Sequence, residues 1–260
     1  MRVMITGGGH GIGRKAVKLL LEEGKEVIVF EKDEEFLDSL PDSVEKYRGD
    51  VADEERVKEV LEEEEFDVLV NNAGYQKMGS LEDMDSESFE RHFRTNVFGP
   101  ASFIRHSMDM LREKDGRIVN VGSIAGQMSF PYMSGYCGSK FALRAMNDSL
   151  RVELRDTEVD VVLVEPGVIL TGFNVEGMRG VRDYMEGSFH SESYEGILER
   201  AESLDGASPE KAGETIYRAV TDTNPSKVYR VPWRVWMVPF LEKTLPTSLR
   251  DLMLYRRESG

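Results

Sequence analysis

Short apolar runs alternate with longer amphipathic stretches through most of the chain. The runs are rich in Val, Ile and Leu, and they span residues 3–6, 27–30, 68–70, 118–121 and 159–164. Runs this short that lack a polar face are typical of strands buried on both sides of a parallel sheet. The pattern therefore predicts parallel strands that are connected through the intervening stretches.

The stretches between these runs have helical periodicity, most clearly over residues 14–23 and 141–155. Their apolar faces consist of Val17, Leu20 and Leu21 in the first stretch and of Leu143, Met146, Leu150 and Leu154 in the second. Strands that alternate with helices in this way predict an α/β protein with an open, doubly wound sheet and helices on both faces.

Beyond residue 171 the pattern changes. Residues 172–206 lack strand-like runs and mix glycines with aromatic side chains, so we expect an insertion or a lid over the substrate. Ser208 and Pro209 begin a further helix, and residues 227–231 form a last predicted strand. Residues 232–260 form an amphipathic tail, with a second predicted helix over residues 248–257. Its first part has apolar side chains at helical spacing, namely Trp233, Trp236, Met237, Phe240 and Leu241. No linker or repeat divides the chain, so a single domain over residues 1–260 is predicted.

Composition and charge exclude several classes of protein. The chain has 33 basic and 48 acidic side chains, and its net charge of −15 argues against nucleic-acid binding because the phosphate backbone would be repelled. The single cysteine, Cys137, excludes an internal disulfide framework, and the four histidines lack metal-ligand spacing, so no metal is expected. The chain has no apolar run of about 18 residues, and the glycine-rich turn begins too near its start for a signal peptide. We therefore expect a cytoplasmic protein.

The charges are unevenly placed along the chain. Residues 31–67 hold 17 acidic and 5 basic side chains, whereas residues 227–257 hold 7 basic and 2 acidic ones. We interpret the acidic block as a solvated face. The basic tail leaves three interpretations open: packing over the active site or in a subunit contact, an interfacial helix that gives peripheral membrane contact, or a partner site.

A glycine cluster follows the first predicted strand and opens the first helix, with the spacing G-x-x-x-G-x-G from Gly7 to Gly13. Glycine allows a tight turn and a close approach of the backbone to a ligand, and a helix N-terminus offers free N–H groups with a partial positive charge. We expect a pyrophosphate to bind against Gly7, His10, Gly11, Ile12 and Gly13.

Glu31 ends the second predicted strand, where a carboxylate can accept hydrogen bonds from an adenosine ribose and would repel a 2′-phosphate. This position favours NAD, although a plain exposed loop acid remains an alternative. The neighbouring Lys32 and His10 could partner a phosphate, so NADP is not excluded. Asp50, beside Val51, is a candidate partner of the adenine amino group.

Tyr136 and Lys140 lie four residues apart at the predicted start of a helix, which places both side chains on one face. A free tyrosine with a pKa near ~10 is a poor base at neutral pH, and a nearby ammonium would lower that pKa. Tyr136 would then act as general acid and base. Ser123 follows a strand and could hold the oxygen of a carbonyl or alcohol substrate. No single piece of this pattern is specific, but the combination is.

With these pieces in this order, the chain resembles the short-chain dehydrogenase/reductase family over roughly residues 2–171. The further matching pieces are Asn71-Asn72-Ala73-Gly74, Asn96, Pro166-Gly167-Val168 and Thr171. The resemblance implies a nicotinamide-dependent oxidoreductase with a Rossmann fold of about seven parallel strands. The tail resembles those of members that act on steroids and retinoids.

The resemblance also implies residue roles. Asn96, Ser123, Tyr136 and Lys140 would form a catalytic tetrad, in which Asn96 holds a water that links Lys140 to solvent. Tyr136 and Lys140 would also contact the cofactor, Lys140 at the nicotinamide ribose. Further cofactor contacts are expected from Asn72, Ala73, Gly74, Pro166, Val168 and Thr171.

The expected substrate wall is apolar, with Met128, Met133 and Phe173 as candidates beside Ser123. Such a wall suits a hydrophobic secondary alcohol or ketone, unless these side chains only pack the lid onto the core. The alternatives are a 3-oxoacyl-type reductase, which Glu31 disfavours, and a non-catalytic NAD(P)-sensing protein. By resemblance, we expect a homodimer or homotetramer whose contacts involve helices near residues 82–112 and 136–155.

Overall fold

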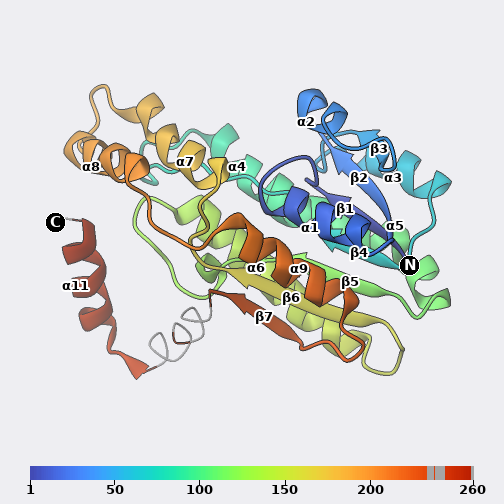
Figure 1. Cartoon of the computed structure of the whole chain (residues 1–260). Coiled ribbons are helices and arrows are strands. Elements are labelled where there is room, and N and C mark those ends of the chain that lie inside the picture. The colour runs from blue at the N-terminus through green and yellow to red at the C-terminus, as the bar shows by residue number, and fades with distance from the viewer. Residues whose placement is uncertain (233–236, 238–243, 259–260) are drawn as a thin grey trace.

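Seven parallel strands form one sheet in the computed structural model, which describes residues 1–232, 237 and 244–258 (Figure 1). The sheet order is β3-β2-β1-β4-β5-β6-β7. The strands are β1 (Arg2–Thr6), β2 (Glu26–Glu31), β3 (Glu45–Arg48), β4 (Val68–Asn71), β5 (Arg117–Val121), β6 (Asp160–Pro166) and β7 (Val228–Val231). The predicted doubly wound sheet is confirmed. β3 carries no apolar run because it is an edge strand and its side chains are only partly covered.

Helices cover both faces of the sheet. The helices are α1 (Gly11–Glu22), α2 (Glu34–Asp38), α3 (Glu54–Glu63), α4 (Ser86–Phe93), α5 (Gly99–Glu113), α6 (Ser134–Glu153), α7 (Gly172–Arg179), α8 (Ser191–Glu202), α9 (Pro209–Thr221) and α11 (Thr247–Glu258), with single turns η1 (Arg94–Phe98), η2 (Ile124–Gly126) and η3 (Gly180–Tyr184). Apolar side chains of α1 and α9 share one core with the sheet, and those of α3 and α5 share the other. α6 begins at Ser134, before the stretch of clear periodicity over residues 141–155, and Tyr136 and Lys140 both lie near its start, as predicted.

The order of the strands reverses between β1 and β4, because β1 pairs with β2 on one side and with β4 on the other. Ligands of open α/β sheets bind outside the carboxyl ends of the strands at such a switch point. Buried asparagines connect this region to α6: Asn71 Nδ2 donates to Asn120 Oδ1 at 2.9 Å, and Asn120 Nδ2 donates to Asn147 Oδ1 at 3.0 Å. These bonds fix α6 relative to the two central strands.

Residues 172–206 form a packed layer of α7, η3 and α8 beside the loop that precedes α4 (Figure 1). This layer has its own buried cluster, which consists of Met78, Met178, Val181, Tyr194, Ile197 and Ala201. The fully buried Tyr194 hydroxyl accepts the Ser80 N–H at 3.0 Å and donates to Asp83 Oδ2 at 2.5 Å. The segment predicted as a lid is therefore fastened to the 77–85 loop by a core and by hydrogen bonds.

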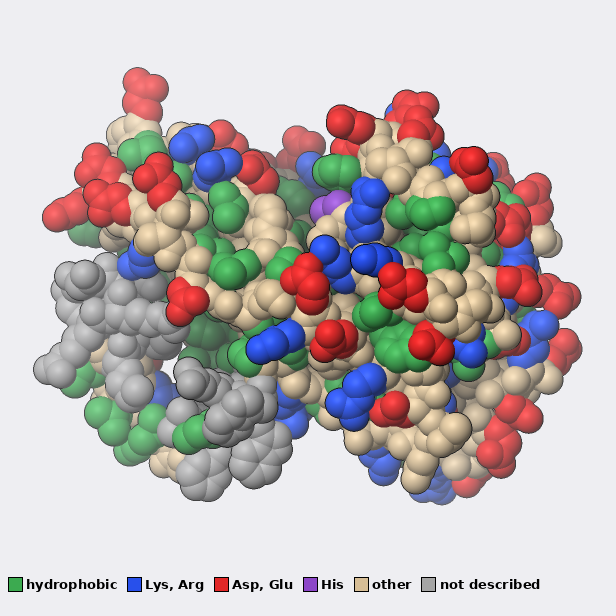
Figure 2. Space-filling model, viewed as in Figure 1, with side chains coloured by type: hydrophobic (Ala, Val, Ile, Leu, Met, Phe, Trp, Pro, Cys, Tyr) green, Lys and Arg blue, Asp and Glu red, His purple; other side chains and the backbone are tan. Residues whose placement is uncertain are grey.

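The acidic block of residues 31–67 is mostly a solvated face with local ion pairs. Examples are Arg48 with Glu34 at 2.8 Å and Arg56 with Glu59 at 3.0 Å. Figure 2 shows acidic side chains over much of one face of the molecule, with Lys and Arg among them. Exposed pairs of this kind contribute little to stability. Glu31 and Glu64 differ, because both are buried.

The predicted helix that begins at Trp233 lies mostly outside the described residues, so its membrane, subunit and partner interpretations stay predictions. α11 (Thr247–Glu258) is the second tail helix predicted over residues 248–257, with bounds that differ by one residue at each end. None of the helices in the described part of the chain is long and apolar enough to cross a membrane.

The Tyr194 hydroxyl provides a stability test of the contact between α8 and the 77–85 loop. Tyr194→Phe should lower the free energy of unfolding by about 1–2 kcal/mol in urea titrations, because the Ser80 N–H and Asp83 each lose a buried partner. Tyr184→Phe is the control, since its hydroxyl binds Asp85 at an exposed position and its loss should cost clearly less. Equal losses in both variants would contradict this account.

Candidate active site

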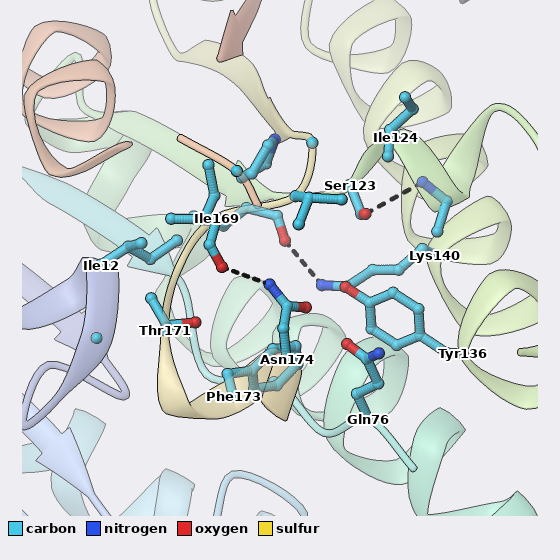
Figure 3. Close-up of a pocket in the computed structure, with 18 of the residues that line it drawn as sticks. Ile12, Gln76, Ser123, Ile124, Tyr136, Lys140, Ile169, Thr171, Phe173 and Asn174 are labelled. Carbon is cyan, nitrogen blue, oxygen red and sulfur yellow. Dashed lines mark hydrogen bonds between the residues drawn. The ribbon is translucent and has the colours of Figure 1, made fainter. Parts of the chain in front are cut away.

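A cavity of about 770 Å³ lies at the carboxyl ends of β1, β4, β5 and β6 (Figure 3). It brings together most of the residues singled out from the sequence: Gly7, His10, Gly11, Ile12, Gly13, Asn72, Ala73, Gly74, Ser123, Met133, Tyr136, Lys140, Pro166, Val168, Thr171 and Phe173. These residues come from the loops that follow four strands and from the starts of α1, α6 and α7. The sheet therefore assembles the site from positions that are far apart in the sequence.

Five of the singled-out residues do not line this cavity: Glu31, Asp50, Val51, Asn96 and Met128. Val51 is buried and packs against Gly99 at the start of α5. The Asp50 carboxylate accepts the N–H of Ala52 at 3.0 Å within its own turn. Asn96 is fully buried outside the cavity lining. The proposed contacts of these residues with cofactor or substrate stay predictions.

The glycine turn has the backbone shape that a dinucleotide needs. Gly7 has φ +65°, and a Cβ there would lie 2.8 Å from the Cα of Ala73, so only glycine fits. Gly11 has φ +55° and faces open space, where the nearest side-chain atom to a Cβ would be Thr171 Cγ2 at 3.9 Å. α1 begins at Gly11 without a side-chain cap, which leaves its first N–H groups available to an anion.

Asn72 supplies a second sign of a ligand beside this turn. Its Nδ2 donates to the carbonyl oxygens of Thr6 at 3.0 Å and Gly7 at 2.8 Å, while its buried Oδ1 has no hydrogen-bond partner among the described residues. A buried acceptor without a donor is costly, and a ligand that donates to it would remove that cost. The turn and the free acceptor together fit a dinucleotide, with its phosphates against Gly11–Gly13.

The Glu31 carboxylate already accepts several hydrogen bonds within the protein, which the sequence did not indicate. Its Oε1 accepts the N–H groups of Lys32 at 2.9 Å and Asp33 at 3.3 Å, and its Oε2 accepts that of Gly9 at 3.2 Å. His10 Nδ1 lies 3.5 Å from Oε2. Burial opposes ionisation of Glu31, but hydrogen bonds from His10, Asp33 and Gly9 outweigh it and lower the pKa of the carboxyl. Glu31 thus holds the glycine turn in place as a buried anion.

Tyr136, Lys140 and Ser123 converge in the cavity, and all three are buried. Lys140 Nζ donates to the carbonyl of Val121 at 2.9 Å and lies 5.9 Å from the centre of the Tyr136 ring. Burial lowers the pKa of Lys140 to about 8. Burial likewise raises the pKa of Tyr136 to about 12, although the Ser123 hydroxyl opposes that shift. Contrary to the expectation from spacing alone, the Lys140 ammonium does not by itself lower the pKa of Tyr136 below its ordinary value.

Asn96 holds the loop after β4 and the start of α6 together. Its Oδ1 accepts the Tyr75 N–H at 2.8 Å, and its Nδ2 donates to Tyr75 O and to Ser139 Oγ, both at 2.9 Å. Ser139 Oγ in turn donates to the Tyr136 carbonyl at 2.7 Å. Asn96 lies in the π-helical turn η1 between α4 and α5, a departure from α-geometry that is frequent at functional sites. The water relay through Asn96 stays a prediction.

A buried carboxylate fixes the far end of the Ser123 loop. Glu165 on β6 accepts from Gln127 Nε2 at 2.6 Å and pairs with Arg144 of α6, while Arg230 Nε of β7 lies 2.9 Å away. Burial raises the pKa of Glu165 in spite of the two guanidinium groups. Through Gln127 the cluster holds the loop that contains Ser123, and through Arg144 it holds α6 four residues beyond Lys140. It therefore helps to fix Ser123 and Lys140 relative to each other.

Several cavity residues were missed by reasoning from the sequence. They are Gln76, Met78, Ile169 and Asn174 close to Tyr136 and Phe173, and Arg200, Leu204 and Lys211 toward α8 and α9. Gln76 stands two residues after the matched Gly74, and this proximity was an available signal. The residues of α8 and α9 gave no signal, because only the packing of residues 172–206 brings them to the cavity.

The fold and the site together define a nucleotide-dependent oxidoreductase of the α/β class. The family model of short chain dehydrogenases matches residues 1–180, and the chain belongs to the short-chain dehydrogenase/reductase family. It is therefore an NAD(P)-dependent enzyme of that family. The resemblance noted in the sequence is confirmed.

Two relatives illustrate the range of similar proteins. Dehydrogenase/reductase SDR family member 7B of Xenopus laevis is 30% identical over 237 residues, which cover 84% of this chain and 70% of the relative. A 3-ketodihydrosphingosine reductase of Bacteroides thetaiotaomicron is 29% identical over 248 residues, with 92% and 88% of the two chains covered.

Solved structures agree with this fold. A short-chain dehydrogenase from Streptomyces avermitilis is 25% identical with a TM-score of 0.80, and the match covers 100% of this chain and 98% of the other. Two Burkholderia enzymes, both 22% identical, share the fold with TM-scores of 0.78 and 0.79. The first, from B. cenocepacia, is in complex with NADP (97% of each chain covered), and the second, from B. phymatum, is in complex with NAD (92% of each).

Burial of Lys140 should be measurable as a stability cost. A protonated amine is disfavoured in the folded state when its pKa falls from 10.5 to about 8, so the cost is present below pH 8 and disappears above pH 10.5. Lys140→Met should therefore raise the free energy of unfolding by about 1–3 kcal/mol at pH 7, with a much smaller gain at pH 10.5. Urea titrations at both pH values check this, with the exposed Lys18→Met as control. A gain that is equal at the two pH values would contradict the explanation.

Proposed function

We propose that this protein transfers a hydride between a nicotinamide cofactor and a hydrophobic secondary alcohol or ketone, with Tyr136 as general acid and base. The convergence of Tyr136, Ser123 and Lys140 in one cavity that also contains the glycine turn carries the proposal. One end of the cavity offers N–H groups and a free amide oxygen, and the other offers two hydroxyl groups and an amine. This arrangement matches a dinucleotide beside a reacting oxygen.

The roles of the three side chains follow from their surroundings. In reduction, the Tyr136 hydroxyl donates its proton to the substrate oxygen while Ser123 orients that oxygen. In oxidation, Tyr136 must lose its proton, and the burial that raises its pKa opposes this. The bound cofactor would donate the hydride in reduction and accept it in oxidation, and its oxidised form would add positive charge that favours the phenolate. Lys140 adds a second positive charge close by, since a pKa of about 8 leaves it mostly protonated at neutral pH.

The substrate side of the cavity supports an apolar substrate. Phe130, Met133 and Phe173 pack around Tyr136, and Met78 and Met178, the latter on α7, line the same cavity. Methionine and aromatic side chains adapt to hydrocarbon groups without requiring polar contacts. One relative is named for the reduction of a ketone, which agrees with this class of reaction.

We propose NAD as the preferred cofactor. Glu31 keeps its negative charge at neutral pH because its pKa is lowered, and this charge lies beside the glycine turn at His10. A 2′-phosphate placed near it would be repelled. The hydrogen bonds that Glu31 already accepts support an electrostatic role more than a direct contact with the ribose.

For the quaternary structure we propose a homodimer or homotetramer through η1, α5 and α6. Phe98 is 62% exposed on η1 and Phe141 is 40% exposed on α6, and an interface over these elements would remove both side chains from water. A cytoplasmic location, with or without peripheral membrane contact of the tail, also stays a proposal.

Removal of the Tyr136 hydroxyl tests the chemistry. Tyr136→Phe should lower kcat by roughly 10²–10⁴-fold, since the variant has no proton to donate and no phenolate to accept one. Cofactor affinity measured by calorimetry should change little, because the glycine turn is untouched. Turnover near that of the parent protein would exclude Tyr136 as the acid and base.

Charge removal at Glu31 tests the cofactor preference. Glu31→Gln should raise the ratio of kcat/KM with NADP to kcat/KM with NAD by roughly tenfold, because the repulsion of a 2′-phosphate is removed. Glu35→Gln removes the same charge from an exposed position in α2 and serves as the control. The electrostatic role of Glu31 is wrong if both variants change the ratio equally.

A further inference from the structure

Gln76 places an amide oxygen without a partner in the substrate half of the cavity. The residue belongs to the loop after β4, and its side chain points toward Tyr136 beside Phe173 (Figure 3). Its Oε1 is buried, and within the described part of the chain no donor reaches it. A buried carbonyl oxygen that lacks a donor loses its hydration without replacement, which costs more than an ordinary hydrogen bond contributes.

The amide is held in this position by the helix that covers it. The Met78 N–H donates to the carbonyl of Gly177 in α7 at 2.8 Å, which fastens the loop to the helix two residues after Gln76. A Cβ on Gly177 would lie 2.8 Å from Cγ and 2.9 Å from Cδ of Gln76. The missing side chain at Gly177 thus leaves the space in which the Gln76 amide lies.

Three other polar side chains of the cavity already have a role or a partner. Tyr136 and Ser123 meet the oxygen that reacts. Asn174, on the same wall, uses its Nδ2 to donate to the carbonyl of Ile169 at 2.7 Å. The remaining surroundings of Gln76 are largely apolar, with Met78, Phe173 and Met178. The free acceptor of Gln76 therefore has to be matched by a donor of the bound molecule, at an atom other than the reacting oxygen.

We propose that Gln76 selects substrates that carry a second hydrogen-bond donor, a hydroxyl or an N–H group, on an otherwise apolar ketone or alcohol. The inference rests on the proposed function and narrows its substrate class to donor-bearing compounds. A site with a buried hydrogen-bonding group rejects an analogue that lacks the matching group more strongly than an apolar pocket rejects a changed hydrocarbon. Gln76 is in this sense a specificity-determining residue.

Matched ketones test the selection in the parent protein. The substrates are 2-decanone and a series of its derivatives with one hydroxyl group at successive carbon atoms, assayed with NADH and NADPH. We expect at least one hydroxyketone to exceed 2-decanone in kcat/KM by roughly tenfold or more. A series in which no hydroxyketone exceeds the plain ketone would overturn the inference and leave the proposed function standing.

Substitutions at Gln76 and Gly177 test whether the Gln76 amide causes the preference for the hydroxyketone over 2-decanone. Gln76→Met has a similar volume without an acceptor and should reduce the ratio of the two kcat/KM values toward one. Gln76→Glu keeps the acceptor and should retain the ratio. Gly177→Ala keeps the amide but displaces it, and it should also reduce the ratio. An unchanged ratio in Gln76→Met would overturn the inference, as would its loss in Gln76→Glu.

Binding separates this inference from the proposed function. Calorimetry in the presence of the oxidised cofactor compares 2-decanol with the diols that correspond to the hydroxyketones. Tighter binding of a diol than of 2-decanol that is lost in Gln76→Met would support the donor selection. This holds even if none of the compounds turned over, although the absence of turnover would count against the proposed reaction. Equal binding of alcohol and diol would overturn the selection whatever the activity.

Discussion

Parallel pairing of β1, β4, β5 and β6 is the constraint on which the rest of this structure depends. Parallel strands end at the same edge of a sheet, so the loops that follow them must come together there. The glycine turn after β1, the asparagine loop after β4, Ser123 after β5 and the Pro166 loop after β6 meet for this reason. None of these segments is close to the others in the sequence.

The same edge contains groups whose burial is unfavourable on its own. Lys140 loses part of its basicity, Tyr136 becomes a weaker acid, and the amide oxygens of Asn72 and Gln76 have no donors within the part of the chain that the structure describes. Buried hydrogen bonds and ion pairs in the surrounding framework offset these costs, although Asn71 Oδ1 and Asn147 Nδ2 also lack a partner among the described residues. The Asn71–Asn120–Asn147 ladder and the Glu165 cluster hold the strands and α6 in place with buried hydrogen bonds and ion pairs. Buried polar groups with perturbed pKa values or without hydrogen-bond partners, held by a stable fold, are the expected arrangement for a binding and catalytic site.

The layer of residues 172–206 links chemistry to specificity. Because Tyr194 and the apolar cluster around it fasten this layer to the 77–85 loop, α7 covers the substrate half of the cavity. Gly177 of this layer then shapes the space for Gln76. The sheet and the start of α6 position the glycine turn, Ser123, Tyr136 and Lys140, whereas the shape of the cavity beside Gln76 depends on how the added layer packs.

The sequence by itself determined the parallel α/β fold, the glycine turn and the grouping of Ser123, Tyr136 and Lys140, because each rests on local patterns and short spacings. It did not determine that the Glu31 carboxylate is already occupied by backbone N–H groups, that burial raises the pKa of Tyr136, or that Gln76 enters the cavity. It also left the bounds of β3, the strand before Asp50, unmarked, since an edge strand needs no apolar run. These features depend on burial and on contacts between distant segments. Only the tertiary structure decides them, because desolvation and long-range hydrogen bonding exist only once the chain has packed.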